Sequence, residues 1–285
     1  MKLADLRQAY HRRICAEIIR INHDSSKGYP NFADVGNKAS IHLAWGIVNR
    51  LGHNLGIEII TGQTSGGRFE EITRDFLEKV FKHLQHLRPG TWYYYSHLPI
   101  SYFDQYAHLA YLEQLIKNNK ELASSLGKDY IIKPDILIGR SPVIDNEINH
   151  QEDLISTEEI YAQLTPFRIA NSSNAHPILH ASISCKWTLR SDRGQNARTE
   201  ALNLIRNRKG HVPHIVAVTA EPLPTRIASL ALGTGDLDCV YHFALFELKE
   251  AIAEAQNEDQ LDMLNMLIEG RRLRDISDLP FDLAT

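Results

Sequence analysis

The chain has 285 residues, and 43% of them are apolar, which is enough for a folded globular protein with a hydrophobic core. The longest apolar runs are about half a dozen residues and no basic-then-apolar signal opens the chain, so we expect no membrane partner. The net charge of −4 counts against a protein that coats nucleic acid by bulk attraction. Three scattered cysteines (Cys15, Cys185 and Cys239) argue against a disulfide framework, so we expect a reducing compartment, the cytoplasm.

The first half of the chain carries the apolar spacing of amphipathic helices. Leucine and isoleucine recur at intervals that place them on one face of a helix. Thr64, Ser65 and two glycines are a reasonable start signal ahead of the third of these segments. The expected helices cover residues 3–21, 41–51, 69–87 and 106–123.

Strand signals come later in the chain. Short segments rich in Ile and Val, bounded by Gly, Pro or charge, predict strands at residues 130–139, 178–187 and 214–220. The polar stretch at residues 146–177 lacks steady periodicity, and we expect it to run over the surface. The helical pattern returns at residues 195–208, so the order is strand, strand, helix, strand.

The final third adds an apolar segment at residues 238–248 and a helix at residues 259–268 that is apolar on more than one side. The second apolar side of this helix is a candidate subunit contact. No internal repeat and no convincing linker divides the chain. We therefore predict one α/β domain over residues 1–285 with a helical N-terminal part.

Three charged side chains are predicted to meet at one edge of the sheet. Side chains alternate faces along a strand, so Ser184 and Lys186 point one way, Cys185 points the other way, and Lys186 closes its strand. If the preceding strand lies beside this one, Asp135 brings a carboxylate to the same edge. Glu200 lies beside the apolar stripe of the following helix and can reach the same place.

Two carboxylates and an ammonium group are suited to phosphodiester hydrolysis, because carboxylate oxygens hold a Mg²⁺ that keeps waters for use as nucleophile. The lysine would polarise that water or steady the charged phosphate. In the alternative interpretation, Asp135 lies in a loop, Lys186 is a solvated strand end and Glu200 pairs with a neighbour on an exposed helix. Each residue alone favours that alternative, whereas the three together, with basic residues around them, favour the catalytic interpretation.

The segment at residues 186–209 is locally basic. Seven basic residues against two acidic ones give it a charge of 7 − 2 = +5, so a polyanion can bind here. Arg190, Asp192 and Arg193 form a fork that suits adjacent G and C bases, because guanine shows two acceptors and cytosine one donor in the major groove. The alternative is an ion-paired helix start in which Asp192 is the cap. Lys209 is better interpreted as a phosphate contact or solvated charge.

These residues carry a resemblance to a known family. Pro134-Asp135, Ser184-Cys185-Lys186, the Arg-Ser-Asp-Arg run and Glu200 resemble the variant PD…K…E signature of tetrameric type II restriction endonucleases that recognise a central CCGG. Blocks such as GQTSG, HASISCKW and RNRKG extend the resemblance to the NgoMIV-like (type IIF) branch along nearly the whole chain. The common nuclease pattern has an acidic residue where this chain has Ser184, and in the variant family the following helix supplies it, as Glu200 does here.

The resemblance implies a Mg²⁺-dependent endonuclease that cuts both strands of double-stranded DNA, most closely at GCCGGC. It implies a restriction-endonuclease-like fold, with a mixed central β-sheet flanked by helices. By the same resemblance, Asp135, Glu200 and the Cys185 backbone carbonyl are metal ligands, and Lys186 is the catalytic lysine.

Further residues follow from the resemblance alone. Glu70 matches the additional acidic residue of the family's site, with Glu71 as the alternative. Asp34 and Arg226 match the readers of the outer base pair, and Gln63 matches a minor-groove contact. The family implies a homotetramer, a dimer of dimers, and a palindromic site itself calls for at least a dimer. Two other classes stay open: a DNA-binding protein that keeps the fold without cutting, and a structure-specific repair nuclease.

Two competing signals are weaker. Histidine pairs such as His83 and His86 have a spacing that can bind metal, but no cysteine or second pair stands at the matching interval. The glycine-rich GQTSGG lacks the Gly-Lys-Ser/Thr ending of a phosphate-binding loop. We therefore expect neither a zinc site nor a nucleotide-binding loop, and we expect the aromatic run at residues 92–95 to be core or interface.

Overall fold

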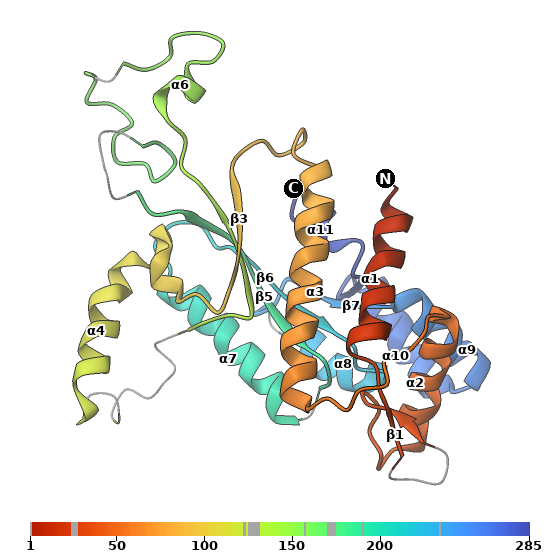
Figure 1. Ribbon diagram of the computed structural model, residues 1–285. Coiled ribbons are helices and arrows are strands. Elements are labelled where there is room, and N and C mark those ends of the chain that lie inside the picture. Colours follow the sequence, from red (N-terminus) through yellow and green to blue (C-terminus); the bar gives the residue numbers. More distant parts are fainter. Residues whose placement is uncertain are drawn as a thin grey trace.

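The computed structural model describes residues 2–23, 28–121, 124, 132–156, 158–169, 175–189, 191–233 and 235–285, with the backbone alone at residues 191–193. Its centre is a six-stranded sheet in the order β3-β4-β5-β6-β7-β8 (Figure 1). The strands are β3 (Trp92–Ser96), β4 (Ile136–Arg140), β5 (Ile178–Lys186), β6 (His214–Thr219), β7 (Cys239–His242) and β8 (Leu273–Asp275). Strands β3 to β5 are antiparallel neighbours and β5 to β8 are parallel, which confirms the predicted mixed central sheet.

Helices surround this sheet and build most of the N-terminal part. They are α1 (Leu3–Glu17), α2 (Lys38–Leu51), α3 (Gly62–His83), α4 (Ala110–Asn118), α6 (Asp145–Ile148), α7 (Ser191–Asn207), α8 (Pro224–Ala231), α9 (Leu245–Ala255), α10 (Glu258–Glu269) and α11 (Leu279–Asp282). Two 3-10 helices, η1 (Ile100–Tyr102) and η2 (Asp104–Leu109), precede α4, and a small antiparallel pair, β1 (Ile21–Asn22) and β2 (Tyr29–Pro30), follows α1. The predicted α/β fold class is therefore confirmed.

Strand β5 lies at the centre of the sheet and is buried along nearly its whole length. Such a strand needs apolar or small side chains on both faces, because helices cover both sides of it. The sequence ILHASISCK meets this need with Ile, Leu, Ala, Ser and Cys. Helix α3 contacts β3 and β5 on one face, and α7 lies on the other face (Figure 1). The site residues carried by α3, β5 and α7 are thus held by a packed core.

Helix α3 begins earlier than its apolar pattern predicts. The hydroxyl of Thr61 accepts the backbone N–H of Thr64 at 3.1 Å, which caps the helix and satisfies one of its free N–H groups. The glycine-rich GQTSGG therefore forms the first turns of the helix rather than a turn before it. The start predicted at residue 69 is wrong by seven residues, because the cap outweighs the low helix propensity of glycine.

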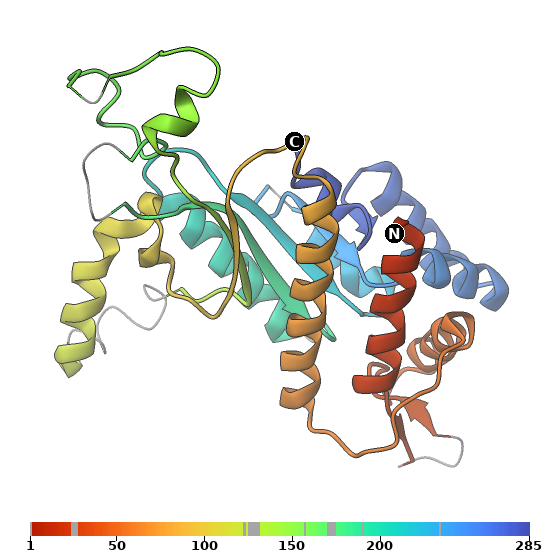
Figure 2. The ribbon, with the colours of Figure 1, turned by 45° about the horizontal axis from the view of Figure 1, so that its top comes forward.

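Between β4 and β5 the chain leaves the sheet as an arm, residues 141–169, which we call the β4–β5 arm. Figure 2 shows it projecting beyond the layers of helix and sheet. At the base of the arm, Arg168 donates a bidentate pair of hydrogen bonds to Asp145, from Nε to Oδ1 at 2.6 Å and from Nη2 to Oδ2 at 2.8 Å. Its outer part exposes four large apolar side chains: Leu154, Ile160, Tyr161 and Leu164. The predicted surface excursion is confirmed for the residues that the structure describes.

Several element boundaries differ from the sequence prediction. The strand predicted at residues 130–139 begins only at Ile136, because Pro134 lacks an N–H for the ladder and the Asp135 side chain turns toward β5. The aromatic run at residues 92–95 is the edge strand β3. The apolar segment at residues 238–248 divides into β7 and the start of α9. Residues 130–131, at the start of that predicted strand, and residues 122–123, at the end of the helix predicted at 106–123, lie outside the described residues.

The helices of the described chain are all too short or too polar to cross a membrane. The three cysteines are unpaired and buried.

Candidate active site

Asp135 is the residue immediately before β4, and its side chain reaches the end of β5. One of its oxygens, Oδ2, accepts the Cys185 backbone N–H at 2.7 Å and the Lys186 ammonium at 2.8 Å. The register that pairs Ile136 with Ile183 sets β4 beside β5 at this edge. The structure therefore brings Asp135 and Lys186 together, as strand alternation predicts.

Lys186 closes β5 and is mostly buried, with 19% of its side chain exposed. Burial by itself lowers the pKa of the ammonium, but the nearby Asp135 and Glu200 carboxylates raise the pKa above its ordinary value. Lys186 is therefore charged at neutral pH. Its neighbour Cys185 points into the core, where burial raises the pKa of the thiol well above its usual value. The raised pKa keeps this thiol protonated, so the side chain fills space in the core and is no nucleophile.

Glu200 enters the same cluster from the middle of α7. Burial raises the pKa of its carboxyl to about 7, the Asp135 charge adds to this rise, and the Lys186 ammonium opposes it. These two influences place Glu200 within electrostatic reach of both charges. Because burial disfavours the ionised form, a cation bound beside this carboxyl would stabilise that form.

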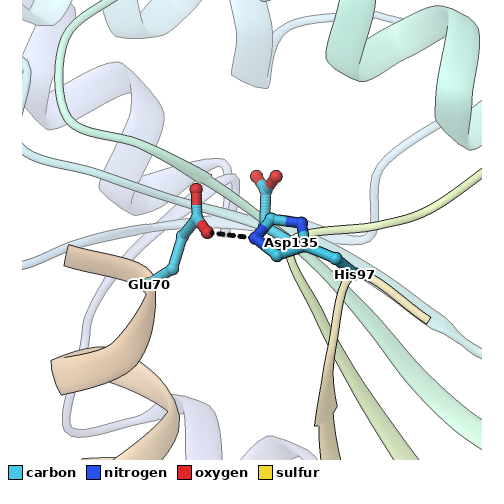
Figure 3. Close-up of side chains that lie close together, drawn as sticks. All are labelled: Glu70, His97 and Asp135. Atoms are coloured by element: carbon cyan, nitrogen blue, oxygen red, sulfur yellow. Dashed lines mark ion pairs between the residues drawn. The ribbon is translucent and has the colours of Figure 1, made fainter. Parts of the chain in front are cut away.

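A third carboxylate faces Asp135 from α3. Figure 3 shows Glu70 and His97 joined by an ion pair, with Asp135 beside them, and the distance from His97 Nε2 to Glu70 Oε2 is 2.9 Å. The first causes of the raised Glu70 pKa are burial and the Asp135 charge. Glu71, the alternative acid, is exposed and lines a different pocket with Arg20. The helix thus presents Glu70, rather than Glu71, to the cluster.

His97 is a member of this cluster that the sequence analysis missed. It follows the edge strand β3 and has a backbone φ of 54°, which is uncommon outside glycine. The backbone N–H of His97 donates to the Pro134 carbonyl at 3.2 Å. This hydrogen bond links the turn to the residue before Asp135. The signal available in the sequence was a histidine directly after an aromatic strand, which points to nothing until the strand is known to border β4.

The donor set fits a hard divalent cation. Among the described residues, Glu70, His97 and Asp135 offer ligand atoms that all lie within 4.8 Å of one another. Glu200 adds a buried carboxyl whose pKa is raised first by burial and then by the Asp135 charge. Oxygen ligands of this kind suit Mg²⁺ and Ca²⁺, and a single imidazole does not exclude them.

The predicted DNA readers fall into two groups. Arg190 lies outside the described residues, and Asp192 and Arg193 are placed in the first turn of α7 by backbone alone. Asp34 and Arg226, far apart in sequence, form an ion pair. Both line a polar pocket of about 310 Å³. Gln63 is exposed in the first turn of α3.

The whole chain has clear relatives. A model of the NgoMIV restriction enzyme family matches residues 10–285. The chain is 47% identical over 284 residues to the type II restriction enzyme NgoMIV of Neisseria gonorrhoeae, which covers 98% of this chain and 97% of that one. The chain belongs to the NgoMIV restriction enzyme family.

As a member of the NgoMIV family, the protein is a type II restriction enzyme, a site-specific deoxyribonuclease that binds DNA and depends on a divalent metal ion. A crystal structure of the type IIF restriction endonuclease Bse634I with cognate DNA is also similar, at 13% identity over 92% of each chain and a TM-score of 0.34. At that level of similarity the fold rests on the strands and helices described above.

Proposed function

We propose that the protein uses Mg²⁺ to hydrolyse both strands of double-stranded DNA within a palindrome with a central CCGG, and that the full site is GCCGGC. The observation that carries the proposal is the contact of Asp135 Oδ2 with Lys186 Nζ at 2.8 Å, with Glu200 and Glu70 near the same carboxylate. Carboxylates and an ammonium group gathered at the edge of a sheet suit a phosphodiester next to a hard cation.

Asp135, Glu200 and the Cys185 backbone carbonyl would hold Mg²⁺ in this site. When bound, the ion supplies positive charge beside the scissile phosphate, where negative charge develops in the transition state. The Cys185 N–H already fixes one Asp135 oxygen at 2.7 Å, so the carboxylate is oriented by the strand itself. Glu70 is the additional acid, and the His97 contact sets its side-chain direction.

Lys186 acts as a cation and a donor in this proposal. Its raised pKa keeps a proton on Nζ at neutral pH, so the side chain can donate to a phosphate oxygen or to the attacking water. Asp135 holds the ammonium in place through the 2.8 Å contact, and burial limits competition from solvent.

We assign recognition of the DNA bases to two segments beside the active site, which we call the reading segments: residues 190–193 and the start of α8 with Arg226. Arg190, Asp192 and Arg193 would read the inner CCGG bases, because they follow Lys186 by only a few residues. Asp34 and Arg226 would read the outer pair, and their ion pair across a polar pocket supports the assignment. Gln63 would contact the minor groove.

We further propose that copies of the chain assemble as a homotetramer, each one a single nuclease domain working in the cytoplasm. A palindrome presents two equal half-sites, so two copies must act on one DNA duplex. The β4–β5 arm offers a second contact surface, because Ile160 and Leu164 are 80% and 100% exposed on it. Leu154 and Tyr161 are exposed on the same arm, so four large apolar side chains gather there, and gathered apolar side chains are typical of surfaces that another copy covers. The unpaired cysteines support a reducing compartment.

Sedimentation of two matched variants tests the assembly. Replacing Ile160 and Leu164 by serine removes apolar surface from the arm, whereas replacing Ile57 and Ile59, which are 97% and 101% exposed elsewhere, removes a similar surface outside it. The arm variant should sediment as a smaller species than the wild type, and the control should keep the wild-type value. Equal sedimentation of both variants and the wild type would count against the arm as the contact.

Cleavage of plasmid DNA tests the activity and the site together. Purified protein is incubated with plasmid and Mg²⁺, and the ends of the products are sequenced. The proposal expects double-strand ends that all map within GCCGGC. Ends at other sequences would reject the recognition site, nicks at branched or mismatched DNA would indicate a repair nuclease, and specific binding without cutting would indicate a DNA-binding protein.

A further inference from the structure

A buried carboxylate outside the active site connects the two segments assigned to DNA reading. Glu221 lies just after β6 and is 1% exposed. Its Oε2 accepts the backbone N–H of Leu189 at 3.0 Å, and its Oε1 accepts that of Leu223 at 3.3 Å. Leu189 immediately precedes Arg190, and Leu223 is the N-cap residue of α8. The side chain therefore touches the backbone of both reading segments.

The first of these contacts prolongs the pairing of β5 with β6. The parallel ladder ends where Lys186 pairs with Thr219, and the Ala220 N–H still reaches the Lys186 carbonyl at 3.4 Å. Beyond that point, the Glu221 side chain takes the place of a backbone acceptor for Leu189. Glu221 thus holds the chain at Leu189, the residue just before the first predicted inner-base reader.

The second contact reaches the predicted reader of the outer pair. Arg226 lies on the first turn of α8, with Nη1 3.9 Å from Glu221 Oε1, and it also pairs with Asp34. Glu221, Arg226 and Asp34 line the same pocket of about 310 Å³. Arg226 therefore lies between two carboxylates, the buried one of Glu221 and the partly exposed one of Asp34.

We propose that Glu221 is a positioning residue that sets the inner and outer base readers in a common register, so that recognition of the outer base pair and of the central CCGG is coupled through this side chain. This inference rests on the proposed function, since it assumes that both segments read DNA. With only 1% of its surface exposed, Glu221 acts in this proposal through the two segments that it contacts.

The energetics of burial support a role beyond packing. Burial raises the pKa of the Glu221 carboxyl to about 7, while the Leu189 N–H, the Arg226 charge and the Leu223 N–H lower it. A buried acid is costly compared with an apolar side chain of the same size, so its contacts rather than its volume explain its presence. Those contacts are backbone N–H groups at the two places where the reading segments begin.

The test compares Glu221→Gln with a matched control, Asp275→Asn. Glutamine keeps the shape of the side chain but has one acceptor oxygen, so one backbone N–H loses its partner. Asp275 is also buried, accepts the Leu245 and Ser277 N–H groups at 3.1 and 3.0 Å, and pairs with Arg7 instead of a predicted reader. The control therefore reports the loss of a buried carboxylate away from the reading segments.

For each protein, kcat/KM is measured on GCCGGC and on sites with one symmetric substitution at the outer or an inner position. Glu221→Gln should lose about tenfold of its discrimination at both positions, because a hydrogen bond to a charged group has that weight. Asp275→Asn should keep the wild-type ratios, and thermal melting shows whether the two variants lose comparable stability. Unchanged ratios in Glu221→Gln, or equal losses in the control, would overturn the inference.

A double variant shows whether Glu221 acts through Arg226. Arg226→Ala should lose discrimination at the outer pair, and adding Glu221→Gln should cost little more there while still relaxing the inner pair. Additive losses at the outer pair would overturn the coupling. Glu221→Asp, which keeps the charge on a shorter side chain, is a second variant at the same position. Failure of both Glu221→Gln and Glu221→Asp to fold would show that Glu221 serves folding alone. Wild-type protein without any site preference would instead reject the proposed function.

Discussion

Raising the pH should destabilise the metal-free protein, and a divalent cation should reverse this effect through Glu200. The folded state raises the Glu200 pKa from 4.5 to about 7, chiefly through burial and then through the Asp135 charge. Between these two values the folded protein keeps a proton that the unfolded chain has released. The stability contributed by this group is therefore fully present below about pH 4.5 and is lost as the pH rises through about 7.

The size of the effect follows from the shift. The difference of 7 − 4.5 = 2.5 pKa units corresponds to roughly 3–4 kcal/mol of unfolding free energy, at about 1.4 kcal/mol per unit. A cation bound to ionised Glu200 offsets the unfavourable charge and adds its own binding free energy. Ca²⁺ is the suitable ion, since it fills an oxygen site without supporting the same chemistry.

Thermal unfolding with EDTA or Ca²⁺ at about pH 5 and about pH 8 measures this linkage. Wild-type protein should gain little from Ca²⁺ at the lower pH and much more at the higher pH. Glu200→Gln, which cannot ionise, should show a weaker pH dependence in EDTA and a smaller extra gain from Ca²⁺ at the higher pH. The raised pKa of Glu221 leaves the rest of the pH dependence in place, and Ca²⁺ should not reverse that part. If Glu200→Gln responds to pH and Ca²⁺ as the wild type does, Glu200 neither titrates near neutrality nor contacts the ion, and our account of the site is wrong.

The remaining predictions address catalysis and readout. Asp135→Ala should abolish cleavage but keep specific binding in Ca²⁺, and full cutting by this variant in a plasmid assay would reject the site. Arg190→Ala should lose roughly 1–3 kcal/mol of discrimination between bases at one symmetric position of the site. Lys209→Ala should instead weaken binding to all sequences alike and reduce the salt dependence of binding. A uniform loss of affinity for Arg190→Ala would make Arg190 a phosphate contact. Glu200→Ala should be nearly inactive in single-turnover cleavage, and Ser184→Glu combined with Glu200→Ser should recover part of the rate, because residue 184 shares a strand face with Lys186. Recovery should be partial, since a displacement of about 1 Å in a catalytic group can cost on the order of a hundredfold; a wild-type rate for Glu200→Ala would contradict the shared site.

The approach of Asp135, Lys186 and Glu200 could be predicted because it depends on short-range periodicity. Strand alternation places Lys186 at the end of β5, a proline before Asp135 sets the start of β4, and the apolar stripe of α7 orients Glu200. The α/β class follows from the same periods, whereas the mixed central sheet was implied by the resemblance to a known family. The resemblance to a known family then added the roles.

Two other contacts, one inside the active-site cluster and one outside it, could not be predicted from local pattern. His97 reaches Glu70 only through a turn with positive φ at the end of an edge strand, and the aromatic sequence of that strand also fits a buried core segment. Glu221 follows an ordinary buried strand, and nothing in the sequence shows that Leu189 lies beside it. These contacts join segments that are distant in the chain, so their information resides in the sheet order.

The position of β5 in that order also affects how the enzyme is made. The strand that carries Lys186 is bordered by β4, which the ribosome synthesises earlier, and by β6, which it synthesises later. A growing chain that stops before residue 214 lacks the neighbour that covers one edge of β5, and it also lacks Glu221. Since domains generally fold as units, the pairing of β5 with β6 forms only after residues 214–219 have been synthesised. The β5 edge that carries Lys186 is therefore paired on both sides only late in synthesis.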